Sequence, residues 1–306
     1  MKDKIKTAYK LMESCRLCPR ECGVNRLRGE KGFCKAGLLP MVSGFHAHFG
    51  EEPPISGQNG SGTIFFTHCS LRCVFCQNHP ISHFGQGEEI SIDRLSEMML
   101  ELQAKGCHNI NFVTPTHYMP QILEAVFITK GKGLSVPLVY NCGGYESLEA
   151  LRILDGIIDI YMPDMKYSDN KASEKYSSAP DYFEASKKAV KEMHRQVGDL
   201  KIDKGIAKKG LLIRHLVLPD NLSGSEAVFD FMNKELGSGT YVNIMAQYYP
   251  CHMAFKFPEI SRRVTRREYM DALALAREKG LLVGFRQALS TIDRVRIPEW
   301  TDDLKG

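Results

Sequence analysis

The sequence lacks the features that would place the chain in a membrane or in the secretory pathway. No apolar run approaches the roughly 18 residues that a transmembrane helix needs. The first residues, Met1–Lys6, are charged and have no apolar stretch of the kind that signal peptides contain. Internal repeats and low-complexity tracts are missing as well. We therefore expect a cytoplasmic protein with no membrane partner.

A strong charge of either sign is also missing. The 40 Lys and Arg residues exceed the 36 Asp and Glu residues by only four, which is too mild an excess to favour a nucleic-acid partner. Hydrophobic residues make up 43% of the 306 residues, as in globular proteins with a sizeable core. Ten cysteines in a chain without an export signal predict thiols and metal ligands rather than disulfides.

Three of these cysteines form the most specific motif. Cys69, Cys73 and Cys76 have the spacing C-x3-C-x2-C and follow the apolar run 62–66. Cysteine thiolates are the usual ligands of a 4Fe–4S cluster, and three of them leave one of its irons without a protein ligand. No fourth cysteine follows to close the set, and an open metal position is typical of catalytic sites. Zinc is the alternative, but zinc loops usually come as paired C-x2-C or Cys/His sets.

A second group, Cys15, Cys18, Cys22 and Cys34, precedes the first within a short glycine-rich segment. The segment is too small to bury a core, and its cysteines predict a metal knuckle. Zinc would hold such a knuckle rigid, whereas a second iron–sulfur cluster could relay electrons. The sequence does not separate these two metals, and four unliganded thiols are the third alternative.

From residue 62 onward, short apolar or β-branched runs alternate with helical patterns. Strands are predicted at 62–67, 109–114, 136–141, 157–163, 211–218 and 241–246, and helices at 92–105, 118–130, 146–154, 182–197 and 224–235. This alternation favours parallel βαβ units in an α/β fold. Six units fit a partial (β/α)6 barrel of the TIM type, with a flavodoxin-like open sheet as the alternative.

The remaining elements lie at the two ends of the chain. A helix is predicted at 3–13 and a strand at 41–49, in which His46 and His48 are expected to be ordinary packed or solvated residues. A helix at 266–279 and a strand at 281–286 follow the six units. We accordingly divide the chain into an N-terminal helix and knuckle (1–58), a barrel core (59–290) and a tail (291–306).

Polar residues stand at or near the carboxyl ends of the predicted strands, where parallel barrels carry their reactive groups. Asn141 ends the third strand, Asp164 and Lys166 follow the fourth, Arg214 lies in the fifth and Gln247 follows the sixth. We expect these side chains to form a pocket above the three cysteines.

The cysteine motif, with the aromatic Phe75 before its last cysteine, resembles the signature of the radical S-adenosylmethionine (SAM) superfamily. In that family the open iron of a 4Fe–4S cluster is chelated by SAM. An electron from the cluster cleaves SAM to methionine and a 5′-deoxyadenosyl radical, which abstracts a substrate hydrogen. The resemblance implies a partial barrel, SAM as cofactor and a one-electron donor such as flavodoxin or ferredoxin.

Within that family the chain is most similar to the activating enzymes of glycyl radical enzymes, the pyruvate formate-lyase activating enzyme type. The similar segments are Cys76–Asn78, Asn141–Gly144, Met162–Lys166 and Ile213–Pro219. The resemblance implies that Lys166 meets the SAM carboxylate and that Asp164 fixes this lysine or holds a cation. Asn78 and Gln247 would contact the ribose or methionine part of SAM, and Arg214 would pair with a cofactor or substrate group. Phe75 and Asn141 complete the implied cofactor site.

The chain also departs from the activases. Thr114–His117 stands where they have Gly-Gly-Glu, and Asn141 replaces an aspartate. Glycyl radical formation on a partner protein is therefore one hypothesis, and radical modification of a small molecule or RNA is the second. A third, from another class, is a non-catalytic metal-binding module for nucleic acid or protein.

Overall fold

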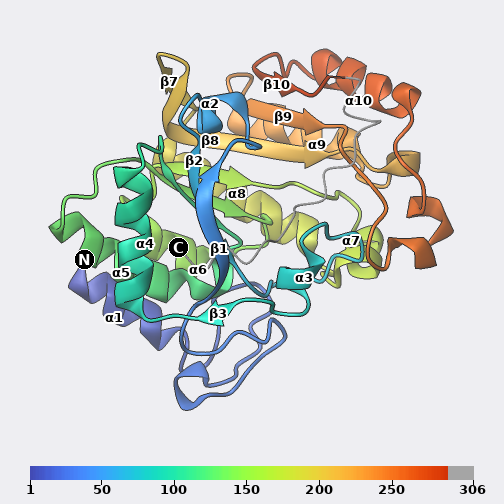
Figure 1. The fold of residues 1–306 in the computed structure, drawn as a ribbon. Coiled ribbons are helices and arrows are strands. Elements are labelled where there is room, and N and C mark those ends of the chain that lie inside the picture. The colour runs from blue at the N-terminus through green and yellow to red at the C-terminus, as the bar shows by residue number, and fades with distance from the viewer. Residues whose placement is uncertain (289–306) are drawn as a thin grey trace.

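The computed structural model describes residues 1–288 (Figure 1). Its helices are α1 (Lys2–Lys10), α2 (Pro53–Ser56), α3 (His79–Ser82), α4 (Ile92–Ala104), α5 (Met119–Gly131), α6 (Leu148–Leu154), α7 (Asn170–Ser177), α8 (Tyr182–Val197), α9 (Ser225–Phe231) and α10 (Arg266–Glu278). The strands are β1 (Met41–His48), β2 (Ser61–Phe66), β3 (Glu88–Glu89), β4 (Ile110–Val113), β5 (Leu138–Cys142), β6 (Ile160–Pro163), β7 (Lys201–Asp203), β8 (Ile206–Leu216), β9 (Tyr241–Met245) and β10 (Gly284–Arg286). The predicted tail, 291–306, lies outside the described residues.

One sheet organises the chain. Its strand order is β10-β9-β8-β6-β5-β4-β2-β1-β3, with β7 added beside β8. The strands from β2 to β10 along this path pair in parallel, whereas β1 pairs antiparallel with β2. The six predicted core strands are thus confirmed in sequential order, and the mostly parallel sheet confirms the predicted α/β fold. Among the described residues the end strands β3 and β10 do not pair with each other, so the barrel is partial.

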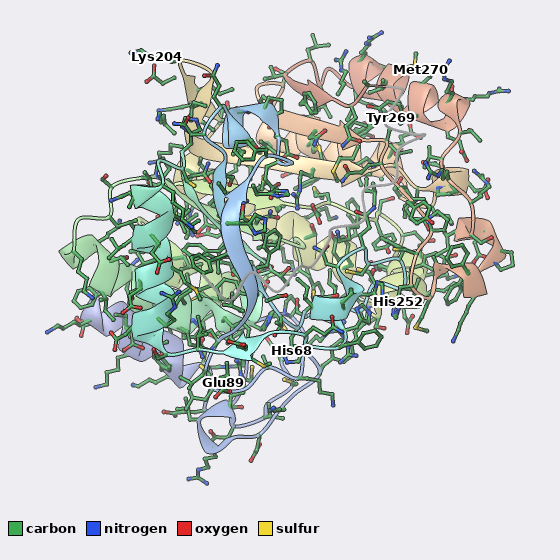
Figure 2. The ribbon with its side chains drawn as sticks, in the orientation of Figure 1. His68, Glu89, Lys204, His252, Tyr269 and Met270 are labelled. Atoms are coloured by element: carbon green, nitrogen blue, oxygen red, sulfur yellow. The ribbon has the colours of Figure 1, made fainter. Side chains whose placement is uncertain are left out.

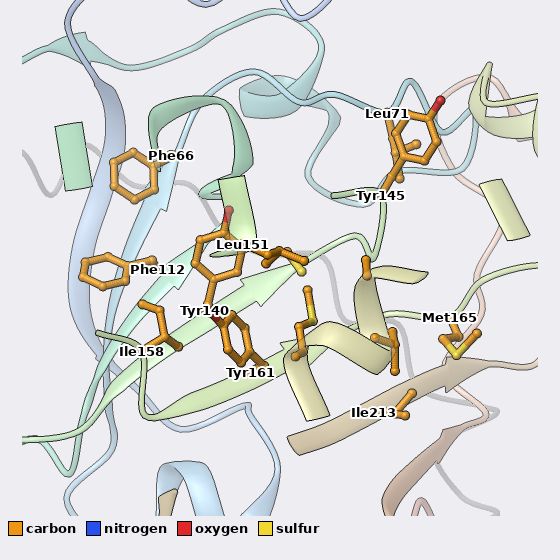
Figure 3. Close-up of a cluster of buried hydrophobic side chains, with 14 of the residues drawn as sticks. Phe66, Leu71, Phe112, Tyr140, Tyr145, Leu151, Ile158, Tyr161, Met165 and Ile213 are labelled. Carbon is orange, nitrogen blue, oxygen red and sulfur yellow. The ribbon is translucent and has the colours of Figure 1, made fainter. Parts of the chain in front are cut away.

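Helices cover one face of this sheet because each presents an apolar stripe to it. In α4, Ser91 caps the first turn by accepting from the Arg94 amide at 3.1 Å, and Leu95, Met98, Met99 and Leu102 are buried. A row of aromatic rings meets these helices from successive strands: Phe66, Phe112, Tyr140 and Tyr161 (Figure 3). Since side chains alternate across a strand, the residues between them face the barrel interior.

The N-terminal part of the sheet extends further than the core predicted from residue 59. β1, predicted as a separate strand, forms a ladder with β2 in which His46 lies opposite Thr63 and His48 opposite Ser61. The sheet therefore begins within the segment assigned to the N-terminal extension. The division of the chain at residue 58 stays a prediction.

Other differences are local. The predicted helix 3–13 ends at Lys10, and the predicted helix 224–235 is α-helical only to Phe231 before a π-helical turn. The helix α7 and the β7–β8 hairpin were not predicted. Both lie in polar, lysine-rich sequence, where hydrophobic periodicity gives little signal.

The short helix α2 closes one end of the barrel. Its Ile55 is fully buried and belongs to a cluster separate from the main core, with Val139, Ile160 and Leu212 from β5, β6 and β8. The Ile55 carbonyl accepts from the Asn109 side chain at 2.8 Å. The connection from β1 to α2 is thereby held inside the barrel, beneath the cysteine loop. No helix within residues 1–288 has the length and apolar character to cross a membrane.

We predict that Ile55→Ala destabilises the protein by about 3 kcal/mol, because it opens a cavity in a packed interior. Ile202→Ala is the matched control, since Ile202 is 46% exposed on β7, and it should change stability by less than about 0.5 kcal/mol. Urea unfolding of the two variants measures both values. Equal, small effects would show that α2 is not part of the core.

Candidate active site

A cavity of about 600 Å³ occupies the barrel interior. Predicted site residues from several strand ends line it together: Cys69, Cys73, Cys76, Asn78, Asn141, Asp164, Lys166, Arg214 and Gln247. Phe75 is buried beside the cavity rather than in its lining, and its ring lies 5.5 Å from that of Tyr248. The structure therefore brings the predicted residues to one place, as expected for strand ends that share one edge of a sheet.

The three cysteines of the loop after β2 each have a hydrogen-bond partner at sulfur. The Leu71 amide donates to Cys69 Sγ at 3.3 Å, Ser177 Oγ donates to Cys73 Sγ at 3.0 Å, and Ser82 Oγ lies 3.2 Å from Cys76 Sγ. Burial raises the pKa of all three thiols, that of Cys76 to about 11. A bound metal would deprotonate them, and the hydrogen bonds are placed to stabilise the resulting thiolates.

This arrangement fits a 4Fe–4S cluster, in which each thiolate binds its own iron. Within residues 1–288, no three His, Cys, Asp or Glu side chains converge closely enough to hold a single metal ion.

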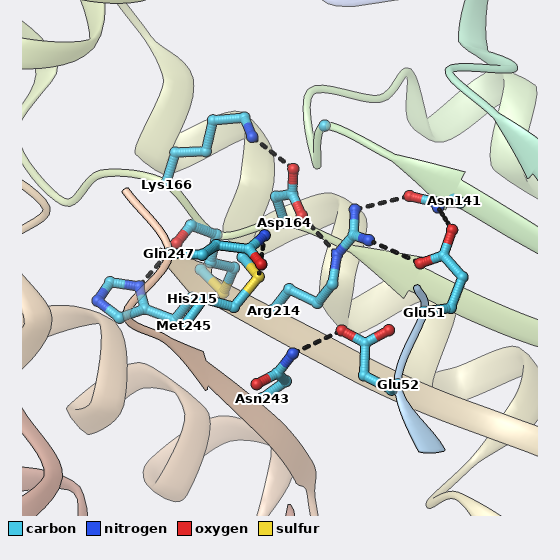
Figure 4. Close-up of polar contacts among 12 residues, drawn as sticks. Glu51, Glu52, Asn141, Asp164, Lys166, Arg214, His215, Asn243, Met245 and Gln247 are labelled. Carbon is cyan, nitrogen blue, oxygen red and sulfur yellow. Dashed lines mark hydrogen bonds and ion pairs between the residues drawn. The ribbon is translucent and has the colours of Figure 1, made fainter. Parts of the chain in front are cut away.

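A row of buried charges crosses the cavity below the cysteines (Figure 4). Asp164 pairs with Lys166 and accepts from Arg214 Nε at 2.8 Å. Arg214 also donates to Asn141 at 2.7 Å and reaches Glu51 at 3.5 Å. Burial acts to raise the pKa of Asp164, but the two cations outweigh it and the net shift is downward. Asp164 is therefore ionised, and it keeps Lys166 charged at the cavity wall.

Glu51 and Glu52, which enter the barrel on the β1–α2 connection, were not predicted as site residues. Glu51 lines the cavity and accepts from Asn111 at 3.0 Å, and Glu52 accepts from Asn243 at 2.6 Å. Asparagines within apolar strands were the signal that could have indicated them, since a buried amide needs polar partners. The two glutamates thus accept hydrogen bonds from side-chain amides on two separate strands, β4 and β9.

The histidines of β1 are packed residues, as expected from the sequence, and they also form part of the cavity wall. His46 and His48 line the cavity, with ring centroids 5.3 and 5.9 Å from that of Phe65 on β2. Because β1 is antiparallel to β2, it adds a wall of flat rings to the side of the cavity. The two histidines lie on β1, which carries none of the predicted cofactor residues.

Of the residues that depart from the activase pattern, Thr114 lines the cavity, whereas Thr116 and His117 make buried hydrogen bonds outside it. Thr116 donates to the buried Glu146 at 2.7 Å. His117 is fully enclosed, its Nε2 lies 2.8 Å from the Thr67 carbonyl, and its own carbonyl accepts from Arg26. His117 therefore supports the cysteine loop from below.

The N-terminal cysteine segment packs directly against the loop that carries Cys69 to Cys76. Arg20 lies over the Phe33 ring and donates to the Ser70 carbonyl at 2.5 Å, and Arg72 donates to the Phe33 carbonyl at 3.3 Å. Cys15, Cys18 and Cys34 are buried, Cys22 is exposed, and none is in a disulfide. Burial raises the pKa of Cys18 to about 12, with smaller contributions from Cys34 and Cys15. A metal in this segment stays a prediction.

Comparisons with known proteins give a family and no assigned activity. The family model of the radical SAM superfamily matches residues 63–203. An uncharacterized protein of Methanocaldococcus jannaschii, MJ0674, is 33% identical over 288 residues, which cover 91% of this chain and 78% of that protein. A second uncharacterized protein of this organism, MJ0808, is 22% identical and is covered to 79%.

Solved structures show the same fold. The FeFe-hydrogenase maturase HydG from Carboxydothermus hydrogenoformans matches with a TM-score of 0.50 and 13% identity, over 74% of this chain and 53% of that one. Streptococcus suis SuiB bound to S-adenosylmethionine matches with a TM-score of 0.50 and 12% identity, over 77% and 52%. The chain spans about half the length of these two proteins.

Glu51 makes the stability of the metal-free protein depend on pH. Burial, opposed by Arg214, raises its pKa from 4.5 to about 7. Between these values the folded protein holds a proton that the unfolded chain releases, so wild-type stability falls as pH rises. Glu51→Gln has no titrating group at this position. Its free energy of unfolding should therefore rise relative to that of wild type by at most about 3 kcal/mol between pH 4.5 and about 7. Urea unfolding from pH 4.5 to above pH 7 measures the difference. A difference independent of pH would contradict the assignment.

Proposed function

The chain belongs to the radical SAM superfamily, and from this premise we propose that it cleaves SAM at a 4Fe–4S cluster held by Cys69, Cys73 and Cys76. The single observation that carries the proposal is the shared cavity of these three thiols and the Lys166–Asp164–Arg214 row. Three cysteines leave one iron for the cofactor, and the buried row offers a cation where its carboxylate would bind.

A cluster held by Cys69, Cys73 and Cys76 would supply one electron for cleavage of the C5′–S bond of SAM. This cleavage would release methionine and the 5′-deoxyadenosyl radical that abstracts a substrate hydrogen atom. The protein's part is to bind and orient. Lys166 carries three N–H donors, of which Asp164 occupies one. The others are free to meet a carboxylate, and Asp164 and Arg214 fix the ammonium group at that place.

The remaining predicted cofactor residues support binding by position. Asn78 and Gln247 line the cavity at the ends of α3 and β9 and offer amide groups suited to ribose or methionine. The side-chain oxygen of Gln247 accepts a hydrogen bond from the Gln287 side chain at 2.8 Å. This bond holds the Gln247 side chain in place. Phe75 packs behind the cysteine loop and holds its shape.

We propose a glycine of a partner protein as the substrate. Support comes from the activase-like segments around Asn78, Asn141 and Arg214, and from their position on one cavity. Radical modification of a small molecule or RNA is the competing possibility. The ring wall of His46, His48 and Phe65 would face the substrate in each case, because it lines the cavity and contains none of the predicted cofactor residues.

Deuterium tracing separates these substrates. A partner protein or peptide labelled at glycine Cα should transfer deuterium to 5′-deoxyadenosine, and mass spectrometry detects the transfer. Deuterium from a labelled small molecule or RNA, and none from glycine, would replace the first proposal with the second.

The first prediction from this function is that wild-type protein, reconstituted with iron and sulfide without oxygen, forms 5′-deoxyadenosine from SAM when dithionite is added. Cys73→Ala should form none above background, because it removes a ligand of the cluster. Cys107→Ala is the matched control, since Cys107 is also buried but does not line the cavity. Equal product from wild type and Cys73→Ala would refute the proposal.

The second prediction is that Lys166→Met weakens SAM binding at least about tenfold, because it removes the cation that pairs with a carboxylate in a buried site. Lys175→Met should leave binding unchanged, since Lys175 is half exposed and pairs with Glu259 away from the cavity. Equilibrium dialysis with labelled SAM gives both constants. Unchanged binding in Lys166→Met would remove this residue from the site.

We further propose that the N-terminal cysteines hold a second iron–sulfur cluster. Support comes from the burial of Cys15, Cys18 and Cys34 in one short segment, and from the contact of this segment with the cysteine loop through Arg20. Cys15→Ala/Cys18→Ala should lose the iron of one cluster and keep the 5′-deoxyadenosine activity with dithionite. Metal analysis that finds one zinc per chain, lost in this variant, would overturn the proposal.

A further inference from the structure

The outer side of the cysteine loop is covered by two thin segments, residues 79–84 and 251–257. The Met253 amide donates to the Val74 carbonyl at 2.9 Å, and Cys251 Sγ donates to the Phe75 carbonyl at 3.2 Å. His252, labelled in Figure 2, lies beside α3. We call His79, His83, Phe84, His252 and Met253 the histidine patch.

The patch is connected to a cysteine sulfur by a short series of contacts. Ser82 Oγ lies 3.2 Å from Cys76 Sγ and 3.0 Å from His83 Nδ1. The His83 and His252 rings meet edge to face at 4.7 Å, and His252 stacks on His79 at 4.6 Å with an angle of 12°. A contiguous set of side chains thus leads from Cys76 to the surface.

The surface of the patch is apolar and carries no negative charge of its own. Phe84 is 65% exposed and Met253 36%, and the two segments contain no Asp or Glu but do contain Lys256. Burial and neighbouring positive groups, Arg72 and Lys256 among them, lower the pKa values of His83 and His252. His83 and His252 are therefore neutral at pH 7, and the cations Arg72 and Lys256 lie close to them.

Other sides of the cysteine loop are occupied. The N-terminal segment covers one through Arg20 and Phe33. The end of α7 covers another, because the Tyr176 and Ser177 carbonyls accept from amides of the loop. The interior side faces the cavity. The patch is the side on which exposed apolar side chains lie next to the loop.

We propose that the histidine patch is the docking surface for an acidic one-electron donor protein of the flavodoxin class. The inference rests on the proposed function, which requires an electron. The donor loses one electron and the cluster gains it, with no atom transferred. Because electron transfer slows steeply with distance, the donor must approach where the cover is thin. An apolar centre with cations around it suits the small interfaces of redox partners.

The test compares two reductants on the same variants. Phe84→Glu places a negative charge at the centre of the patch, and Ile202→Glu makes the same change of charge on β7, far from α3 (Figure 1). SAM cleavage is driven either by dithionite or by flavodoxin that NADPH and flavodoxin reductase keep reduced. Phe84→Glu should raise the KM for flavodoxin about tenfold and leave the dithionite rate unchanged. Ile202→Glu should change neither, and added salt should weaken the wild-type reaction with flavodoxin.

Different results refute the SAM cleavage activity and the docking surface. If wild type forms no 5′-deoxyadenosine with dithionite, the proposed function fails and the docking surface with it. If dithionite works, the docking surface alone is refuted by any of three results. These are no turnover with flavodoxin in wild type, an unchanged KM in Phe84→Glu, or an equal loss with both reductants.

Discussion

The pairing of Asp164 with two buried cations is the interaction on which the site depends. A buried carboxylate is costly unless it is paired and hydrogen-bonded, and here Lys166 and Arg214 meet it from opposite sides. Arg214 in turn is held by Asn141 and by Glu51 from the β1–α2 connection. The charge that would meet the cofactor is therefore fixed by groups from β5, β6, β8 and the segment that plugs the barrel.

This chain of contacts explains why the N-terminal part of the molecule matters for the site. β1 extends the sheet, and the connection after it carries Glu51 and Glu52 into the interior above the Ile55 plug. The cysteine segment before β1 packs on the loop that carries Cys69 to Cys76. A partial barrel that began at residue 59 would lack Glu51 beside Arg214 and the two histidine rings beside the cavity.

The core of the fold and the gathering of the predicted site residues around one cavity could be predicted, because both leave local signals. Six apolar strands alternate with helices, and the polar residues at their ends must converge in a parallel barrel. Glu51 and Glu52 could not be predicted this way, because a Glu-Glu-Pro-Pro segment is typical of a surface turn. Their burial follows from hydrogen bonds with Asn111 and Asn243, which are far away in the sequence. The role of His46 and His48 depends on a long-range pairing of strands, which no local pattern encodes.

The central claim is that SAM binds the iron that Cys69, Cys73 and Cys76 leave open. The most direct measurement is electron–nuclear double resonance on the reduced, reconstituted protein with SAM labelled at its carboxylate and amino groups. We expect hyperfine coupling of both labels to the cluster in wild type, because both groups would ligate one iron. Binding of labelled SAM without any coupling to the cluster would contradict it.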